Sequence, residues 1–107
     1  MIEIDIHPGQ IAVSGHAEYA PQGQDIVCAA VSTLVQTLSA SIMELTEDVA
    51  QGCEMPGKSI LITKHLSDEK TKLLIDAFLV GVNMIADTYP DHVRIIWAGV
   101  EPIKATD

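Results

Sequence analysis

Residues 25–45 have the sequence DIVCAAVSTLVQTLSASIMEL, and this stretch decides the fold. Its apolar residues recur at spacings of three and four, which predicts an amphipathic helix of about five or six turns. Asp25 is a suitable N-cap, because its carboxylate can accept hydrogen bonds from the free N–H groups of the first turn. The first two turns, from Ile26 to Val31, are apolar nearly all round, so we expect this helix to begin inside the protein.

The segment before this helix predicts a β-hairpin and then a loop. Isoleucines alternate with acidic residues from Ile2 to Ile6, which is the pattern of a half-buried strand. His7-Pro8-Gly9 indicates a turn, and Gln10 to Ser14 then returns as a second strand. Residues 15–24, GHAEYAPQGQ, show no periodicity, and their glycines and proline favour a loop.

The segment after the helix predicts a second hairpin. Residues 47–55 fit either a frayed helix end or a short strand, whereas Ser59 to Thr63 fit a strand. Pro56-Gly57 between them indicates a turn, so we expect the two segments to pair.

The remaining residues predict a second long helix and a last strand. Ser67 is a candidate N-cap, and the helix should end near Tyr89-Pro90 because proline lacks the N–H donor. Val93 to Trp97 fit a strand, and residues 101–107 fit a loose tail. The sequence therefore predicts one α+β domain over residues 1–107, with two helices packed on one face of a largely antiparallel sheet in the order ββαββαβ.

Charge and composition exclude several classes of protein. The chain has 107 residues, with 15 acidic against 6 basic side chains and a net charge of −9. This balance argues against direct nucleic-acid binding and against docking on anionic lipid, and it favours a basic partner. A domain of this size buries limited surface, so a dimer would add stability.

The first residues and the cysteines indicate a compartment. Met1 to Asp5 are acidic and alternating, unlike a signal peptide, and we expect no window to approach the roughly 20 apolar residues of a membrane span. Without an export signal we expect the cytoplasm, where thiols stay reduced. Cys28 and Cys53 must therefore each be a core residue, a metal ligand or a nucleophile.

Cys28 and His16 are the candidate reactive pair. Cys28 is three residues after Asp25, in the first helical turn, where free N–H groups and the helix dipole stabilise a thiolate. The loop between them is long enough for His16 to approach Cys28, and a thiolate beside an imidazole is the arrangement of a cysteine nucleophile with its acid–base partner. N–H groups between Gly23 and Cys28 could hold an oxyanion, and Gly15 and Gly23 could let the loop swing.

Simpler interpretations of the same residues remain open from the pattern alone. Cys28 also fits a small core residue, His16 a surface histidine, and Asp25 a helix cap without chemistry. Ser32 would hydrogen-bond the carbonyl oxygen of Cys28. We expect no metal or other cofactor, because ligand spacings such as C-x₂₋₄-C are absent among the candidate ligands His7, His16, Cys28, Cys53, His65 and His92.

Two sets of residues resemble the ribosomal-processing cysteine protease family, Prp. The first set is the family signature, found here as Gly15-His16-Ala17, Gly23, DIVCAAVS at 25–32 and Leu34. The second set resembles the family's second helix and its end, with Leu73-Leu74, Gly81 and IADTYP at 85–90. The resemblance covers nearly the whole chain and is weakest over residues 47–67 and in the tail.

The resemblance implies a function and a set of site residues. Members of the family are small cytoplasmic homodimers of bacteria that remove an N-terminal extension from ribosomal large-subunit protein twenty-seven, cutting after an aromatic residue. The family's catalytic cysteine and histidine fall on Cys28 and His16, and its supporting aspartate and serine fall on Asp25 and Ser32. Two other functions stay possible: a non-catalytic dimeric module that binds a basic ribosomal or assembly protein, and a thiol hydrolase of small amides.

Overall fold

The computed structural model describes residues 1–21, 23–55, 57–64, 68–100 and 102 of the chain. Over these residues the elements follow the expected order ββαββαβ. They are β1 (Ile2–His7), β2 (Gln10–Ser14), α1 (Ile26–Leu45), β3 (Val49–Met55), β4 (Lys58–Lys64), α2 (Glu69–Thr88) and β5 (Val93–Trp97).

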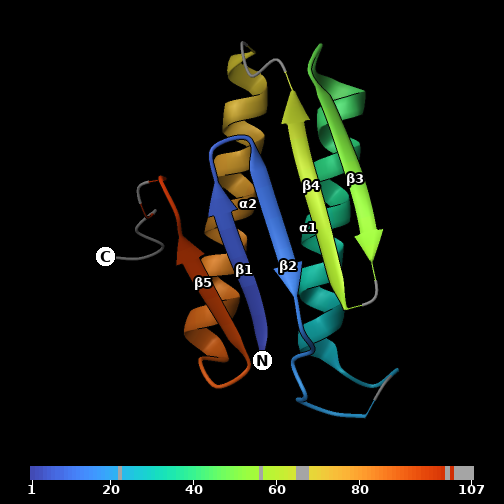
Figure 1. The fold of residues 1–107 in the computed structure, drawn as a ribbon, viewed down its shortest axis with the longest axis vertical. Coiled ribbons are helices and arrows are strands. Elements are labelled where there is room, and N and C mark those ends of the chain that lie inside the picture. The colour runs from blue at the N-terminus through green and yellow to red at the C-terminus, as the bar shows by residue number, and fades with distance from the viewer. Residues whose placement is uncertain (22, 56, 65–67, 101, 103–107) are drawn as a thin grey trace.

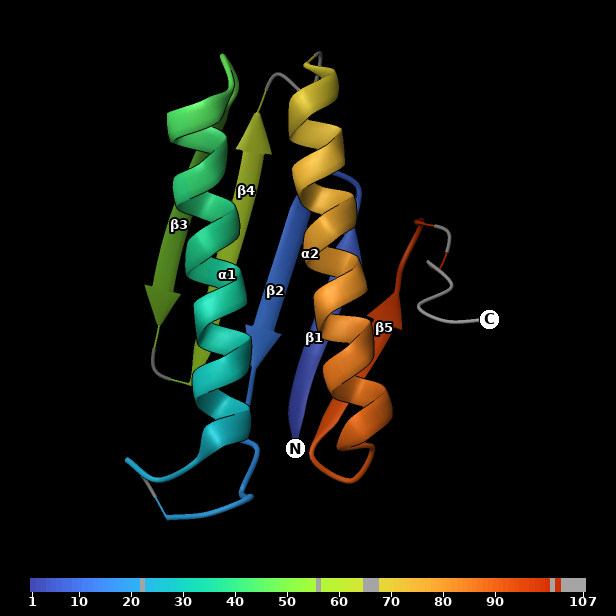
Figure 2. The ribbon, with the colours of Figure 1, turned by 180° about the vertical axis from the view of Figure 1, so that it is seen from behind.

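The strands form one sheet in the order β3-β4-β2-β1-β5 (Figure 1). Three neighbouring pairs are antiparallel, and β5 pairs with β1 in parallel, with Ile4 opposite Ile95. Both helices lie on the same face of this sheet (Figure 2). The predicted α+β fold with a largely antiparallel sheet is therefore confirmed.

The core lies between the sheet and the two helices. Ile2, Ile4 and Ile6 are buried, so the alternation in β1 points its aliphatic side chains at the helices. Buried positions of α1 (Val27, Val31, Leu38 and Ile42) face them from the other layer. Each such side chain stabilises the fold by about 1.5–3 kcal/mol. The packing therefore fixes the N-terminus of α1 beside the end of β2.

A glycine permits the close approach of the two helices. A Cβ at Gly81 of α2 would lie 3.1 Å from Leu34 Cδ1 of α1. A Cβ at this position would require the Leu34 side chain to shift by a few tenths of an ångström.

Two expectations about the helix ends are wrong. The start of α1 lies at the surface, not inside the protein, because only Val27 and Val31 of its first turns are buried while Ile26 is 56% exposed. The N-cap of α2 is Asp68, whose Oδ1 accepts a hydrogen bond from the Lys70 N–H. Ser67, the residue expected there, lies outside the described residues.

The central segment is settled as a strand. β3 pairs with β4 in antiparallel register, with Cys53 opposite Ile60, so residues 49–55 do not continue the helix. Gly57, after β3, has a φ of +72° that suits the turn. Pro56 and the tail residues 101 and 103–107 lie outside the described part of the chain.

The expectation about membrane spans also needs correction. By length and composition alone, α1 is apolar enough to cross a membrane, with a mean hydropathy of 1.8 over its most apolar window. Most of the polar residues in α1 are serine and threonine, which lower this mean little. In this fold α1 lies along the sheet and contributes four buried residues to the core, and core helices of this kind meet the same criteria.

Candidate active site

A cleft opens where β2 ends and α1 begins. Its volume is about 790 Å³ and its lining residues are His16, Glu18, Ala20, Gly23, Asp25, Cys28, Ala29 and Ser32. We call it the main cleft. The structure thus brings together five of the six residues that the sequence singled out.

A smaller hollow adjoins the main cleft. It has a volume of about 250 Å³ and shares His16, Cys28 and Ser32 with the main cleft, and Gly15 lines it as well. The end of β3, at Met55, and the beginning of β4, at Lys58, form part of its wall. We call it the side hollow. Cys28 and His16 therefore face two adjacent spaces, as a group must when it acts on the middle of an extended chain.

Asp25 fixes the start of α1 as the sequence predicted. Its Oδ1 accepts hydrogen bonds from the Val27 and Cys28 N–H groups, each at 3.0 Å. The bond from the Cys28 N–H is the largest cause that lowers the pKa of Asp25 below its ordinary value. Asp25 therefore stays ionised at neutral pH and caps the helix.

The second oxygen of Asp25 holds the loop. Oδ2 accepts hydrogen bonds from the Tyr19 N–H at 3.1 Å and the Ala20 N–H at 3.5 Å. All hydrogen bonds that the described residues make to this carboxylate come from backbone N–H groups, and none comes from His16. Asp25 is thus a cap for the helix and a fixed point for the loop, rather than a direct partner of the histidine.

Cys28 is half-buried and open to both spaces. Its side chain packs against the core and also lines the main cleft and the side hollow. The Sγ atom accepts a hydrogen bond from the Ala17 N–H at 3.4 Å. Cys28 therefore contacts the loop and both spaces as well as the core.

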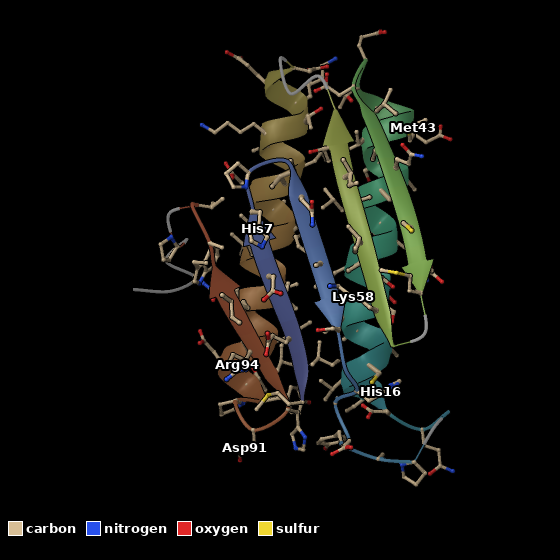
Figure 3. The ribbon with its side chains drawn as sticks, viewed as in Figure 1. His7, His16, Met43, Lys58, Asp91 and Arg94 are labelled. Atoms are coloured by element: carbon tan, nitrogen blue, oxygen red, sulfur yellow. The ribbon has the colours of Figure 1, made fainter. Side chains whose placement is uncertain are left out.

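His16 lies on the loop beside Cys28, at the same end of the molecule as the start of α1 (Figure 3). It is exposed, and its ring makes no hydrogen bond to Cys28 within the described part of the chain. Catalytic hydrogen bonds are often long in the free enzyme and tighten when substrate binds. The two side chains therefore share the main cleft in an open arrangement.

Gly15 determines the backbone path into His16. Its φ is +84°, and a Cβ at this position would lie 2.3 Å from the Met1 carbonyl oxygen. The His16 carbonyl oxygen accepts a hydrogen bond of 2.6 Å from the Met1 amino group. Only glycine fits at position 15, and its role is to place His16.

Ser32 and Gly23 both line the main cleft, whereas Gly15 lines the side hollow. Ser32 is exposed and lines both spaces, and its predicted bond to the Cys28 carbonyl is not made in the described structure. Thr33 makes the equivalent bond one residue later, to the Ala29 carbonyl at 2.8 Å. Gly23 has a φ of +86°, and a Cβ there would meet nothing within 4 Å.

His92 and Tyr89 hold the loop from the other side, a role that the sequence did not indicate for either residue. His92 Nδ1 is 2.8 Å from the Ala17 carbonyl oxygen. The Tyr19 ring packs edge-on against His92 and Tyr89, with centroid distances of 5.3 and 5.4 Å. His92 is 75 residues from Ala17, so only the pairing of β1 with β5 brings it near, and no local pattern signals it.

The described residues contain no set of side chains that could bind a metal ion. No group of three or more His, Cys, Asp or Glu side chains there is arranged to hold an ion. One candidate from the sequence, His65, lies outside this part of the chain.

The site defines a class of protein. A free cysteine at a capped helix N-terminus, open to a cleft that a histidine also lines, is an arrangement that a thiol-dependent hydrolase can use. A family model described as Cysteine protease Prp matches residues 1–94. The chain therefore belongs to the Prp family of ribosomal processing cysteine proteases, and it is a cysteine protease.

Individual relatives agree with this assignment. The ribosomal processing cysteine protease Prp of Mycoplasma genitalium is 31% identical over 101 residues, which cover 89% of this chain and 94% of that protein. The structure of SMU.848 from Streptococcus mutans matches with a TM-score of 0.78 at 32% identity, over 92% of this chain and 95% of that one.

A third relative shares the fold at lower identity. It is the essential ribosomal processing protease Prp from S. aureus, solved in complex with a covalently linked product peptide. Its TM-score is 0.82 at 20% identity, over 91% of this chain and 97% of that one.

Proposed function

We propose that this cysteine protease removes the N-terminal extension of ribosomal large-subunit protein twenty-seven, with Cys28 as nucleophile and His16 as its acid–base partner. The observation that carries the proposal is the Cys28 sulfur, which lies at the Asp25-capped N-terminus of α1, in the main cleft that His16 also lines. The family supplies the kind of substrate, and the net charge of −9 suits a basic ribosomal protein.

The reaction proceeds in two halves. His16 accepts the thiol proton, and the Cys28 sulfur forms a bond to the scissile carbonyl carbon. The tetrahedral intermediate collapses, the C–N bond breaks, and His16 gives the proton to the departing amine. Water then attacks the acyl-enzyme with His16 as base, which releases the extension as a carboxylic acid and restores the thiol.

We expect the oxyanion donor to be one of the N–H groups between Gly23 and Cys28 that the sequence suggested, but not those of the helix cap. The Val27 and Cys28 N–H groups are bonded to the Asp25 carboxylate, and the Ala29 N–H is bonded to the Asp25 carbonyl. These three groups are occupied in the helix cap. The Gly23 N–H in the loop is therefore the better candidate.

The Asp25 and Ser32 roles follow from their places in the main cleft. Asp25 supports the nucleophile by fixing both its helical turn and the loop that carries His16. Ser32, four residues after Cys28, presents its hydroxyl to the bound peptide. The enzyme is expected in the cytoplasm as a homodimer, and sedimentation of the purified chain would give its mass.

Removal of the sulfur tests the proposal directly. Cys28→Ala should lower cleavage of a peptide spanning the extension junction by at least about a thousandfold, because alanine has no group that can attack the scissile carbonyl. Cys53→Ala is the matched control, since that cysteine is exposed on β3, and it should cut at the parental rate. Cleavage by Cys28→Ala near the parental rate would remove Cys28 from the mechanism.

The same assay separates the remaining functions. A parental protein that binds the junction peptide without cutting it would be a binding module. A protein that hydrolyses small amides but leaves the peptide intact would be a hydrolase of another substrate class.

A further inference from the structure

Ala17, the residue after His16, is held on both sides of its backbone. Its N–H donates to Cys28 Sγ at 3.4 Å, and its carbonyl oxygen lies 2.8 Å from His92 Nδ1. Ala17 itself is only 1% exposed. One short backbone segment therefore connects the proposed nucleophile to a histidine on the other side of the loop.

The hydrogen bond between His92 and Ala17 has a defined direction. A carbonyl oxygen can only accept, so His92 Nδ1 carries the proton and donates it. This bond restrains the Ala17 carbonyl and therefore the rotation of the segment that carries the Ala17 N–H. The orientation of that N–H toward sulfur decides whether its hydrogen bond to Cys28 Sγ is made.

His92 belongs to the fixed frame of the molecule. It lies between α2 and β5, where its own N–H donates to the Tyr89 carbonyl at 3.0 Å and its carbonyl accepts from the Ile2 N–H at 2.8 Å. Figure 3 shows the preceding residue, Asp91, at the same end of the molecule as His16. The loop residue Ala17 is thus bonded to a rigid support rather than to another part of the loop.

We propose that His92 is a positioning residue, which holds the Ala17 amide at the Cys28 sulfur and so keeps the nucleophile reactive. This inference rests on the roles proposed above for Cys28 and His16. His92 does not touch the reacting atoms, and it acts through Ala17. Its second contact, the edge-on packing with Tyr19, stabilises the loop but supplies no hydrogen bond to Ala17.

Two substitutions separate the hydrogen bond from the ring. His92→Asn places an amide N–H where Nδ1 stands and removes the aromatic ring. His92→Phe keeps a ring against Tyr19 and removes the donor. Both are made in a Cys53→Ala background, so that Cys28 is the remaining thiol.

The first measurement is the rate at which iodoacetamide alkylates Cys28 near pH 7, which needs no substrate. The second is kcat and KM for the junction peptide. His92→Phe should lower the alkylation rate and kcat by roughly three- to tenfold, the range for one net hydrogen bond, with KM unchanged. His92→Asn should restore both to within about twofold of the parent.

Each outcome decides the question. Parental rates in His92→Phe would overturn the proposal, and equal losses in both variants would show that the ring matters rather than the donor. If thermal melting shows that His92→Phe does not fold, His92→Asn decides alone, and slow alkylation in that variant overturns the proposal. Failure of the proposed protease function would appear instead as cleavage by Cys28→Ala, whatever residue stands at position 92.

Discussion

Gly15 places the proposed acid–base residue, because the backbone before His16 turns with a φ of +84° and passes the Met1 carbonyl. Gly15→Ala should therefore destabilise the fold by more than the 1–2 kcal/mol or so that a left-handed backbone costs a residue with a Cβ. Gly57→Ala is the matched control, since its φ is +72° and a Cβ there meets nothing within 4 Å. Urea unfolding compares the two variants, and equal losses would mean that the contact with Met1 costs nothing.

Single residues also show how much of the site could be predicted from the sequence. Cys28, Asp25 and His16 lie within thirteen positions, so a cap, a helical turn and a loop are enough to predict that they gather at one site. His92 and Met55 reach the same site through strand pairing and a hairpin far along the chain, and no local pattern contains that information. Ile26 was misplaced because a turn that is apolar all round has no periodicity to say which side faces the core.

The two long helices begin at aspartate caps, and this has a consequence for stability in acid. The bond from the Lys70 N–H is the largest cause that lowers the pKa of Asp68, the cap of α2, below 3.8. A carboxyl whose pKa is lower in the folded state stabilises the fold above its unfolded pKa. That contribution is lost as the pH falls through the folded value. The pKa of Asp25, the cap of α1, is also lowered, so its charged form stabilises the fold over the same direction of pH.

Asp68→Asn tests this effect, because the amide oxygen can still cap the helix at the Lys70 N–H, while the charge and the Oδ2 acceptor of the Glu47 N–H are both removed. The parent should unfold at higher urea than the variant at neutral pH, and the difference should shrink as the pH falls below 3.8 and vanish below the lowered pKa of folded Asp68. Peptide cleavage should stay parental, since Asp68 does not line the main cleft or the side hollow. A difference that persists unchanged at pH 2 would assign the stability to something other than the carboxylate.

The whole molecule presents a strongly acidic surface to its substrate. Its net charge is −9, and Glu18 and the ionised Asp25 add negative charge in the main cleft itself. Such a field raises the rate of encounter with a basic polypeptide, and dissolved salt screens it, since the Debye length falls from about 10 Å at 0.1 M to about 3 Å at 1 M. For the proposed basic substrate, we therefore expect kcat/KM to depend on the salt concentration.

For a junction peptide that carries lysines, kcat/KM should fall severalfold as the salt concentration rises from roughly 0.05 M to 0.5 M, while kcat stays nearly constant. Surface charge changes the rate of association with the substrate but not the bond-breaking step at Cys28 and His16. The effect of salt should therefore appear in KM. A peptide with its lysines replaced by glutamine should show little salt dependence, and Glu18→Gln should weaken the dependence for the lysine peptide. A salt effect of equal size on both peptides would mean that salt acts on the enzyme itself, and the acidic surface would then have no part in selecting the substrate.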